Sequence, residues 1–349
     1  MTDTVCISLG IATAVACLAI ACAAAATNPP PQASANGPQY KVAFSFAPAE
    51  GLGHEKGLCR RDPSDIIGAG DEHFVWYTKV ERWGVKTGRH GYNSGYQGEV
   101  WCAVSSDAGR TWKELGRAIA KGPAGAFDCT GVFTPNILAW DGKYYLYYTA
   151  VGPDFDNGPY EDRNRTAIGV AVSDSPRGPW VKSKSNPVLK STRDPNRFDS
   201  YRVDDSCFVV RGGKIWMYYK GRQWKNTPAN TKMGVAVAER PEGPFTRVNE
   251  GRTVQPGGHE VMVWPWGDGV MSLVSKHGRV GQTLQYAADG VRFKSAGTIP
   301  SPYPRAPGLF RPDLTDPDAK LTDRLWGISM TAKDGDPYLQ RYEIALSEQ

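Results

Sequence analysis

The chain has 349 residues, of which 40% are hydrophobic, and this is enough for one large domain with a well-buried core. Its formal net charge is +5, but the cations are not clustered, and the densest groups are Arg60-Arg61 and Lys182-Ser-Lys184. We therefore interpret the excess positive charge as solvated surface, and we do not expect a nucleic-acid partner.

The N-terminus predicts an export signal over residues 1–26. From residue 5 this stretch is almost entirely small or apolar, and it ends in Ala23-Ala-Ala-Ala26, which is typical of a small-residue cleavage site. The first Lys or Arg of the chain is Lys41, so the basic start of a simple signal is missing. A retained membrane anchor and a lipid-carrying Cys22 are the alternatives. Cleavage would place the protein in the periplasm or outside the cell, with no membrane partner.

After the signal, the sequence predicts a Pro-rich linker over residues 27–39 and a single domain over residues 40–349. The domain has four cysteines, none of them closely spaced: Cys59, Cys102, Cys129 and Cys207. This spacing gives no metal signature, and no metal or cofactor is expected beyond a structural ion on the fold axis. One disulfide and four buried thiols remain equal alternatives.

Five segments rich in aromatic and β-branched residues predict strands, and helical periodicity is hardly visible. These central strands are Phe74–Thr78, Tyr144–Thr149, Ile215–Lys220, Val270–Ser275 and Leu325–Met330. Their starts lie 70, 71, 55 and 55 residues apart, a spacing typical of a repeated four-stranded unit. The sequence therefore predicts an all-β fold, a five-bladed β-propeller.

Hairpin turns closed by an aromatic residue repeat with the strands. They are Ser105–Trp112, Ser173–Trp180, Glu239–Phe245 and Ala287–Phe293. The first is a full Asp-box, Ser-x-Asp-x-Gly-x-Thr-Trp, in which Asp and Gly form a tight turn. The Asp-box supports a propeller and says almost nothing about chemistry.

Three acidic clusters precede the central strands of the first, third and fourth repeats. They are Arg60–Asp65, Val203–Ser206 and Gly257–Glu260. The innermost strands of a propeller converge on one mouth, so carboxylates far apart in sequence are expected to meet there. Hydrolysis of a glycosidic bond needs an acid and a base or nucleophile, and this constellation supplies both. The 11 Trp and 16 Tyr residues agree, because aromatic faces stack on sugar rings, although most of them are expected in the core.

Two longer motifs make the resemblance to a family specific. The first motif is Gly51-Leu-Gly-His-Glu-Lys-Gly57 with Arg60-Arg-Asp-Pro-Ser-Asp-Ile-Ile67, and the second is Phe127-Asp-Cys-Thr-Gly-Val-Phe-Thr-Pro-Asn-Ile-Leu138. Both motifs resemble those of glycoside hydrolase family 117. The resemblance covers residues 50–345. It implies a five-bladed propeller, related to the arabinosidase and xylosidase propellers, that releases 3,6-anhydro-L-galactose from the non-reducing end of neoagaro-oligosaccharides. The α-1,3 linkage would be cleaved with inversion.

The resemblance assigns the general base to Asp62, with Asp65 as the competitor and a turn cap as the non-catalytic alternative. Arg61, or its neighbour Arg60, is expected to hold a carboxylate or a sugar hydroxyl, and a side chain that only faces solvent is the alternative. Asp205 resembles the carboxylate that stabilises charge on the sugar, although Ser206 stands where related enzymes carry Pro. Because neighbours on a strand point to opposite faces, we expect only one of Asp204 and Asp205 to enter the site.

His259 matches the position of the family's acid, and Glu260 is the alternative acid or a ligand for a sugar hydroxyl. A histidine side chain ordinarily titrates at a pKa of about 6.5, near neutrality, and Gly257-Gly258 would let the backbone approach a ligand. A purely structural histidine is the alternative. Inversion would require about 6.5–9.5 Å between the acid and the base.

Three further residues, Thr134, Asn136 and Trp264, are expected to line the pocket and contact the oligosaccharide. The resemblance implies a helical N-terminal segment that supports dimers, and we expect it to be absent or shortened here, so the oligomeric state stays open. An arabinosidase or xylosidase type of exo-glycosidase, a glycosidase for another algal glycan, and a non-catalytic sugar-binding propeller are the alternative functions.

Overall fold

The computed structural model describes residues 37–84, 95–157, 160–255, 257, 259–276, 281–316 and 318–349, and of residues 260, 261, 275 and 276 the backbone alone. These residues belong to one unit, Asn36–Gln349. The predicted signal peptide lies outside them, as does the predicted linker up to residue 36. Within the described ranges, no helix has the length and apolar character needed to span a membrane.

The described part of the chain forms five antiparallel sheets, so the predicted five-bladed β-propeller is confirmed. Blade 1 consists of β2 (Leu58–Arg61), β3 (Ile67–Ala69), β4 (Glu72–Glu81), β5 (Glu99–Ser105) and β6 (Lys113–Ile119). Blade 2 consists of β7 (Gly131–Trp140), β8 (Lys143–Val151), β9 (Ala167–Ser173), β10 (Val181–Lys182) and β11 (Leu189–Lys190). Blade 3 consists of β12 (Arg202–Arg211), β13 (Lys214–Arg222), β14 (Lys232–Ala238) and β15 (Thr246–Arg247).

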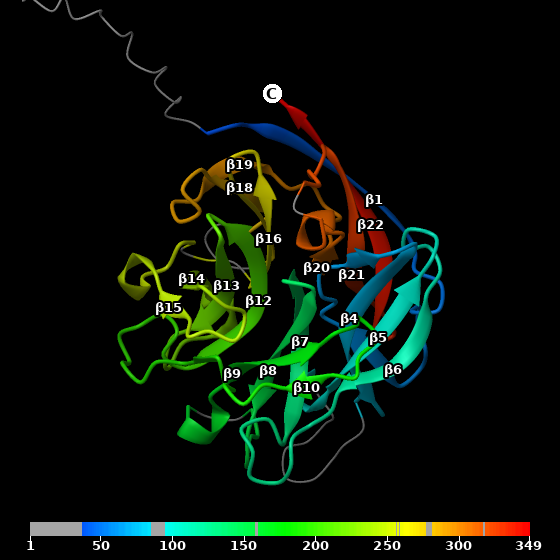
Figure 1. Cartoon of the computed structure of the whole chain (residues 1–349). Helices are drawn as coiled ribbons and strands as arrows, with labels where there is room; N and C mark the ends of the chain where they lie inside the picture. The colour runs from blue at the N-terminus through cyan, green and yellow to red at the C-terminus, as the bar shows by residue number, and fades with distance from the viewer. Residues whose placement is uncertain are drawn as a thin grey trace, which may run out of the picture. The chain divides into compact units, whose positions relative to one another are not determined.

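Blade 4 consists of β16 (His259–Trp266), β17 (Gly269–Lys276), β18 (Thr283–Ala287) and β19 (Lys294–Thr298). Blade 5 consists of β20 (Arg305–Leu309), β21 (Arg324–Lys333), β22 (Asp336–Glu348) and β1 (Tyr40–Pro48). Short 3₁₀ turns connect the strands: η2 (Gly95–Gln97), η3 (Asp162–Asn164), η4 (Pro228–Asn230), η5 (Asn249–Gly251) and η6 (Pro312–Leu314). In Figure 1, β7, β12, β16 and β20, the innermost strands of blades 2 to 5, lie around the centre.

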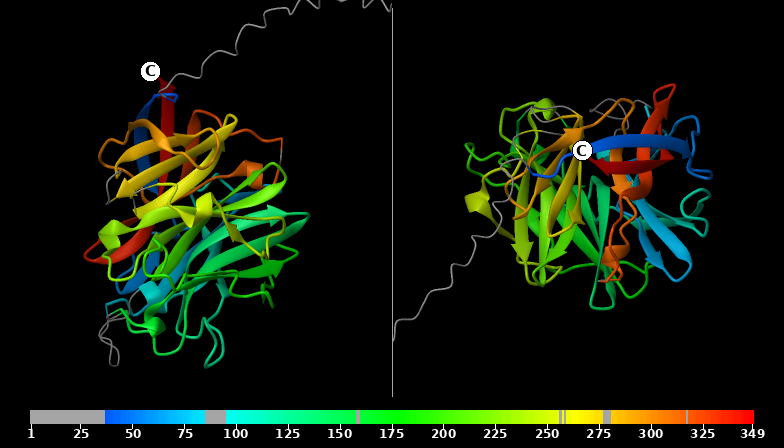
Figure 2. Two further views of the ribbon diagram at one scale, coloured as in Figure 1. Left: turned by 90° about the vertical axis from the view of Figure 1, so that its left-hand side faces the viewer. Right: turned by 90° about the horizontal axis from the view of Figure 1, so that it is seen from above.

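The first strand of the domain closes the ring. β1 pairs with β22 along its whole length, from Tyr40↔Glu348 to Pro48↔Gln340, and the two run side by side in Figure 2. The first and last segments of the domain therefore share one blade, and their pairing closes the ring.

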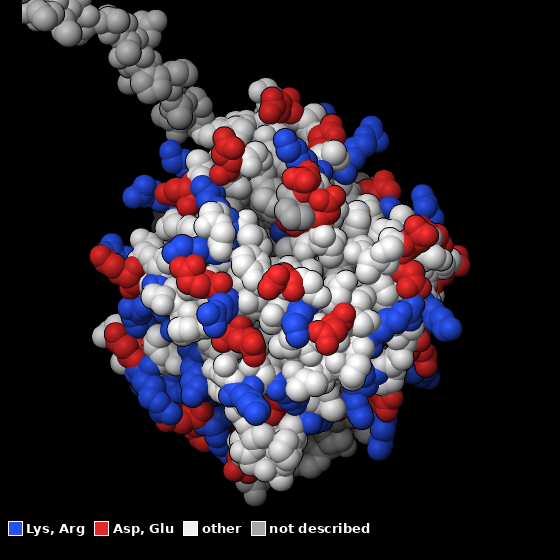
Figure 3. Space-filling model, in the orientation of Figure 1, with Lys and Arg blue, Asp and Glu red and all other residues white. Residues whose placement is uncertain are grey.

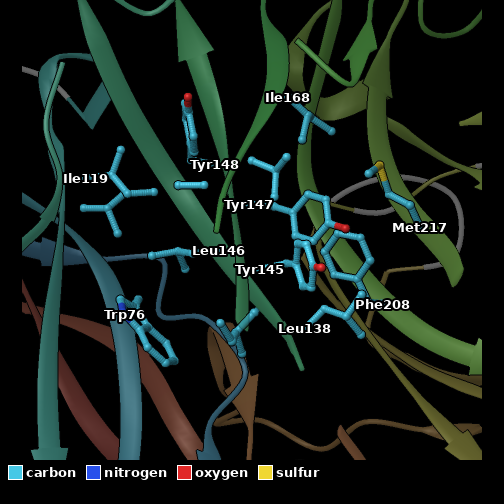
Figure 4. Packing of buried hydrophobic residues seen from close by; sticks show 14 of the residues in the cluster. Trp76, Ile119, Leu138, Tyr145, Leu146, Tyr147, Tyr148, Ile168, Phe208 and Met217 are labelled. Carbon is cyan, nitrogen blue, oxygen red and sulfur yellow. The ribbon is translucent and has the colours of Figure 1, made fainter. Parts of the chain in front are cut away.

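The central strands predicted from the sequence lie in β4, β8, β13, β17 and β21, the second strand of each blade. They are apolar on both faces because each blade packs against its neighbours. In β8, Tyr147 stacks on Phe208 of blade 3 with a ring-centroid distance of 4.1 Å, whereas Tyr148 lies on the other side of the strand, toward Ile119 of blade 1 (Figure 4). This two-residue alternation joins three blades into one hydrophobic cluster.

The Asp-box turn has the hydrogen bonds that its sequence predicts. The Asp107 carboxylate accepts bonds from Ser105 Oγ at 2.8 Å and from the backbone N–H of Thr111 at 2.9 Å, and these bonds lower the pKa of Asp107 to about 2. The Trp112 indole donates to the Gly109 carbonyl at 2.9 Å. Elsewhere the surface is mixed in charge: cations and anions are interspersed on the face in Figure 3. This agrees with the interpretation of the net charge as solvated surface.

Close contact between blades 5 and 1 leads to a first prediction. A Cβ at Gly308 in β20 would stand 1.8 Å from the backbone oxygen of Ser64. Gly308→Ala is therefore expected to reduce the stability of the fold by more than about 2 kcal/mol, because backbone must move to make room. Thermal unfolding measures the change. Gly53→Ala is the matched control, since a Cβ there meets no atom within 4 Å. Equal midpoints for the two variants would contradict the close contact.

Candidate active site

A β-bulge recurs on the innermost strand of four blades, in the part of the chain that the structure describes. At each bulge the register shifts and one non-glycine residue has a positive φ: Asp62 (49°), Thr134 (43°), Asp205 (49°) and Ala306 (41°). All four residues line one cavity at the propeller axis. The bulges therefore turn equivalent positions of four blades toward the same point, at a cost in backbone strain.

The sequence explains why the ladder breaks at these positions. Proline follows the bulged residue in three of the four cases, as Pro63, Pro135 and Pro307. Because proline has no backbone N–H, it cannot continue a sheet ladder and is tolerated at a bulge. β16 of blade 4 shows no register shift along its described pairs.

A second cavity adjoins the first and shares Asp62, Thr134 and Asp205 with it. Its walls combine carboxylates, cations and aromatic rings from blades 1 to 4. They comprise Arg61, Asp62, Gly95, Tyr96, Phe133, Thr134, Arg202, Asp204, Asp205, Lys220, Arg222, Pro228, Thr231 and His259. The fold thus brings together Asp62, Asp205 and His259, which the sequence analysis selected from three separate repeats.

Asp62 and Asp65, the two candidates for the base, have different surroundings. Asp62 lines the cavity, and Arg61 Nε donates to its Oδ2 at 2.6 Å. Asp65 is 2% exposed and accepts bonds from Arg311 and from the N–H of Leu309, at 3.3 and 3.0 Å. Burial raises the pKa of Asp65 to about 6, although these two partners oppose the increase. Asp65 therefore joins blades 1 and 5, and Asp62 is the acid that a ligand can reach.

Asp204 and Asp205 both line the cavity, so the expectation that only one of them enters the site was wrong. The strict alternation of a strand is broken between Asp204 and Cys207, where the positive φ of Asp205 turns its side chain to the same side as that of Asp204. Lys220 forms an ion pair with Asp205, and its Nζ lies 3.6 Å from Asp204. Burial raises the pKa of Asp204, against the lowering influence of Lys220.

His259 begins β16 and lines the cavity opposite blade 1. Its Nδ1 lies 3.2 Å from Thr231 Oγ1, and the Thr231 hydroxyl also reaches the carbonyl of Pro228 at 3.1 Å. The backbone of Glu260 follows His259 in the strand, and the side chain of Glu260 lies outside the described part of the chain. The choice between His259 and Glu260 as acid therefore stays a prediction.

The three residues predicted to line the pocket lie in different places. Thr134 lines both cavities. Asn136 lines the axial one, but its Oδ1 already accepts from the N–H groups of Asp65 and Ile137, at 3.2 and 2.7 Å. Trp264 is fully buried in the hydrophobic cluster of blades 4 and 5, so the expectation that it contacts sugar was wrong. Because the strand alternates, its side chain points between the blades instead of toward the axis.

Several pocket residues were not predicted: Tyr96, Arg202, Lys220, Arg222 and Thr231. A signal was present for three of them. Arg202 pairs directly with Arg222, and Asp204 with Lys220, on the adjacent strands β12 and β13. Charged residues two apart on neighbouring strands share one face of a sheet, and a charged face inside a propeller points to the axis.

No group of three or more His, Cys, Asp or Glu side chains within the described ranges has the arrangement of a metal site. None of the four cysteines of the domain forms a disulfide, and Cys59, Cys102 and Cys207 are buried. The disulfide left open by the sequence is therefore not formed. Burial raises the pKa of Cys59 and of Cys102 to about 12, as expected for unreactive core thiols.

Comparison with known proteins identifies the class. Residues 61–206 match the family model of glycosyl hydrolases family 43. The chain is 35% identical over 92 residues to xylosidase/arabinosidase 43A of Humicola insolens, and 38% identical over 88 residues to extracellular endo-alpha-(1->5)-L-arabinanase 2 of Bacillus subtilis. It spans only 22% and 17% of the length of these two proteins. Fold and site together define a propeller of the glycoside hydrolase class.

A solved structure identifies the family. Zg3597, a family 117 glycoside hydrolase from the marine bacterium Zobellia galactanivorans, is 30% identical, with a TM-score of 0.74 over 87% of this chain and 90% of its own. A GH43_1 enzyme from Xanthomonas citri shares the fold at 16% identity, with a TM-score of 0.56 over 86% and 90% of the two chains. The protein belongs to glycoside hydrolase family 117.

The raised pKa of Asp204 leads to a prediction about pH. Its folded-state value of about 6 exceeds the usual value of about 3.9 for the unfolded chain, so the folded state binds this proton more tightly. Wild-type stability relative to Asp204→Asn should therefore increase as the pH falls from about 6 to 4. Thermal unfolding of both proteins at pH 7 and pH 5 measures the difference, expected to be a few degrees.

Asp141→Asn, at an exposed turn, is the control for this prediction and should track the wild type at both pH values. A gap between wild type and Asp204→Asn that does not depend on pH would show that Lys220 outweighs burial at this carboxyl.

Proposed function

We propose that the protein is an exo-acting glycoside hydrolase that releases 3,6-anhydro-L-galactose from the non-reducing end of neoagaro-oligosaccharides. The reaction is hydrolysis of the α-1,3 linkage with inversion of the anomeric carbon. The observation that carries the proposal is the convergence of Asp62, Asp205 and His259, from blades 1, 3 and 4, on one cavity. Membership of family 117 and the long motifs around Arg60–Ile67 and Phe127–Leu138 support it.

The contacts of Asp62, Asp205 and His259 support a separate catalytic role for each of them. Asp62, held by Arg61, acts as the general base that activates water. Asp205, paired with Lys220, stabilises the positive charge that develops on the sugar ring in the transition state. His259 gives a proton to the departing oxygen, and Thr231 orients its ring. Glu260 is the alternative donor.

The walls of the cavity support action at a chain end. Gly95 and Tyr96 of η2 stand on one side, and Pro228 of η4 and Thr231 on another. A cavity bounded by loops of different blades accepts a terminal ring more readily than the middle of a polysaccharide.

The family 43 match over residues 61–206 favours a second candidate, an exo-glycosidase of the arabinosidase or xylosidase type. Such an enzyme would keep Asp62 and Asp205 and differ in the residues around them. Chromogenic arabinosides and xylosides, assayed beside neoagarobiose, separate the two candidates. A sugar-binding propeller without activity would hydrolyse none of these compounds.

The decisive experiment is incubation of the purified protein with neoagarobiose, followed by proton NMR from the first minutes. Release of 3,6-anhydro-L-galactose with the anomeric configuration opposite to that of the substrate is expected. Asp62→Asn should reduce kcat by at least about 100-fold, because the carboxylate that activates water is lost while the shape is kept.

Asp141→Asn is again the control and should retain full activity. If the folded protein releases no sugar from neoagarobiose, the proposed substrate is wrong. If Asp62→Asn is as active as the wild type, the base is another group.

A further inference from the structure

The second cavity contains two buried arginines that face each other across strands β12 and β13. Arg202 and Arg222 are direct partners in the register of the two strands, and both line the cavity. Their exposed fractions are 2% and 9%. A buried guanidinium loses most of its hydration, so it needs compensation from nearby acceptors or anions.

That compensation is incomplete in the described part of the protein. Arg202 donates to Tyr96 Oη at 2.7 Å and to Asn157 Oδ1 at 2.9 Å, which are both neutral. Arg222 lies over the ring of Tyr201, 5.2 Å from its centroid, and makes no hydrogen bond or ion pair with a described residue. The Nε atoms of both arginines are buried without an acceptor. Burial and the neighbouring charge of Arg202 lower the pKa of Arg222.

Other buried arginines of this fold have carboxylate partners. Arg60 is paired with Glu114, Arg341 with Glu343, and the fully buried Arg311 with both Asp65 and Asp313. Each of these three buried arginines, which lie outside the second cavity, is therefore neutralised by at least one carboxylate. Arg202 and Arg222, at the candidate active site, are the exceptions among these buried arginines.

The carboxylates of the cavity fill this role only in part: the charge of Asp204 raises the pKa of Arg222, but burial and the charge of Arg202 outweigh it. Asp62 is paired with Arg61, and Asp205 with Lys220. The nearest recorded cation to Asp204 is Lys220, at 3.6 Å, and no ion pair within 4 Å joins Asp204 to either arginine among the described residues. Among the described residues, the cavity lining holds four Lys or Arg side chains and three carboxylates, so one formal positive charge is in excess there.

We propose that this pocket recognises an oligosaccharide carrying an anionic group, a sulfate ester or a carboxylate, on the galactose ring to which the released terminal sugar is joined. Arg222 binds the anion, and Arg202 contributes the second positive charge. A guanidinium fork matches the paired oxygens of a carboxylate or sulfate and bonds them at both nitrogens. A neutral ring would leave the excess positive charge of the pocket without a counter-charge, so the anion determines substrate choice. This inference rests on the proposed glycosidase function and narrows its substrate class.

The test measures binding separately from hydrolysis. The full-length protein is titrated calorimetrically at pH 7 and low salt with D-galactose, D-galacturonate and D-galactose 6-sulfate, none of which has a glycosidic bond to cleave. At least one anionic sugar is expected to bind tenfold or more tightly than galactose. The better of the two anionic sugars identifies the carboxylate or the sulfate ester as the group recognised.

Arg222→Met is expected to remove this preference, so that neither anionic sugar binds the variant more tightly than galactose does. The variant should fold, because removing an uncompensated buried charge does not destabilise a protein as breaking an ion pair does. Arg341→Met is the matched control: Arg341 is also buried and also lies over an aromatic ring, Trp326, but in blade 5. It should keep the full preference for the anionic sugar.

Hydrolysis of neoagarobiose, measured beside the titrations, separates this inference from the proposed function. If neoagarobiose is hydrolysed while both anionic sugars bind no better than galactose, the anion site is refuted and the activity stands. If an anionic sugar binds through Arg222 and neoagarobiose is not hydrolysed, the anion site stands and the proposed substrate is wrong. A preference that survives in Arg222→Met refutes the assignment of the arginines.

Discussion

The buried guanidinium of Arg311 at the propeller axis is the interaction on which the geometry of the site depends. Its Nη1 donates to Asp65 of blade 1 at 3.3 Å and to the carbonyls of Phe208 and Val263, in blades 3 and 4, at 3.1 Å. Asp313 of η6 accepts from the remaining nitrogens at 2.7 and 2.8 Å. One cation thus fixes the relative position of the strands that carry the candidate acids. The desolvation cost of a buried charge is offset because every side of the guanidinium has an acceptor.

The strain at the cavity is tolerated because the axis beneath it is rigid. Asp65 also donates its N–H to Asn136 of blade 2, so the network around Arg311 extends to the blade that carries Thr134. Asp62 and Thr134 lie only a few residues from these anchors and have the positive φ that non-glycine residues rarely adopt. Strained residues persist where their surroundings over-determine them. The same network that closes the ring therefore holds the bulges that direct side chains into the pocket.

The sequence was sufficient for the fold and for the blades that supply the site, because both depend on local patterns. Aromatic strands, an Asp-box and acidic clusters ahead of three strands are readable without three-dimensional information. The failures have one physical origin, which is the direction of a side chain on an irregular strand. Trp264 was expected to contact the sugar, but its side chain lies in the hydrophobic core. Asp204 and Asp205 were expected on opposite faces of the strand, but both side chains face the cavity because a β-bulge breaks the alternation of side chains along β12. A bulge depends on pairing with a neighbouring strand, and a single strand's sequence does not specify it.

Buried arginines have different partners at the propeller axis and in the candidate active site. At the axis, Arg311 is surrounded by acceptors and contributes to closure of the ring. In the pocket, Arg202 and Arg222 share one face of blade 3 and have aromatic rings and neutral oxygens as partners. A fold optimised for stability alone would place a carboxylate or apolar side chains there, as it does elsewhere. Because aromatic rings, neutral oxygens and the single carboxylate Asp204 compensate two buried guanidiniums less fully than paired carboxylates do, their presence in the pocket is best explained by a ligand that supplies further negative charge.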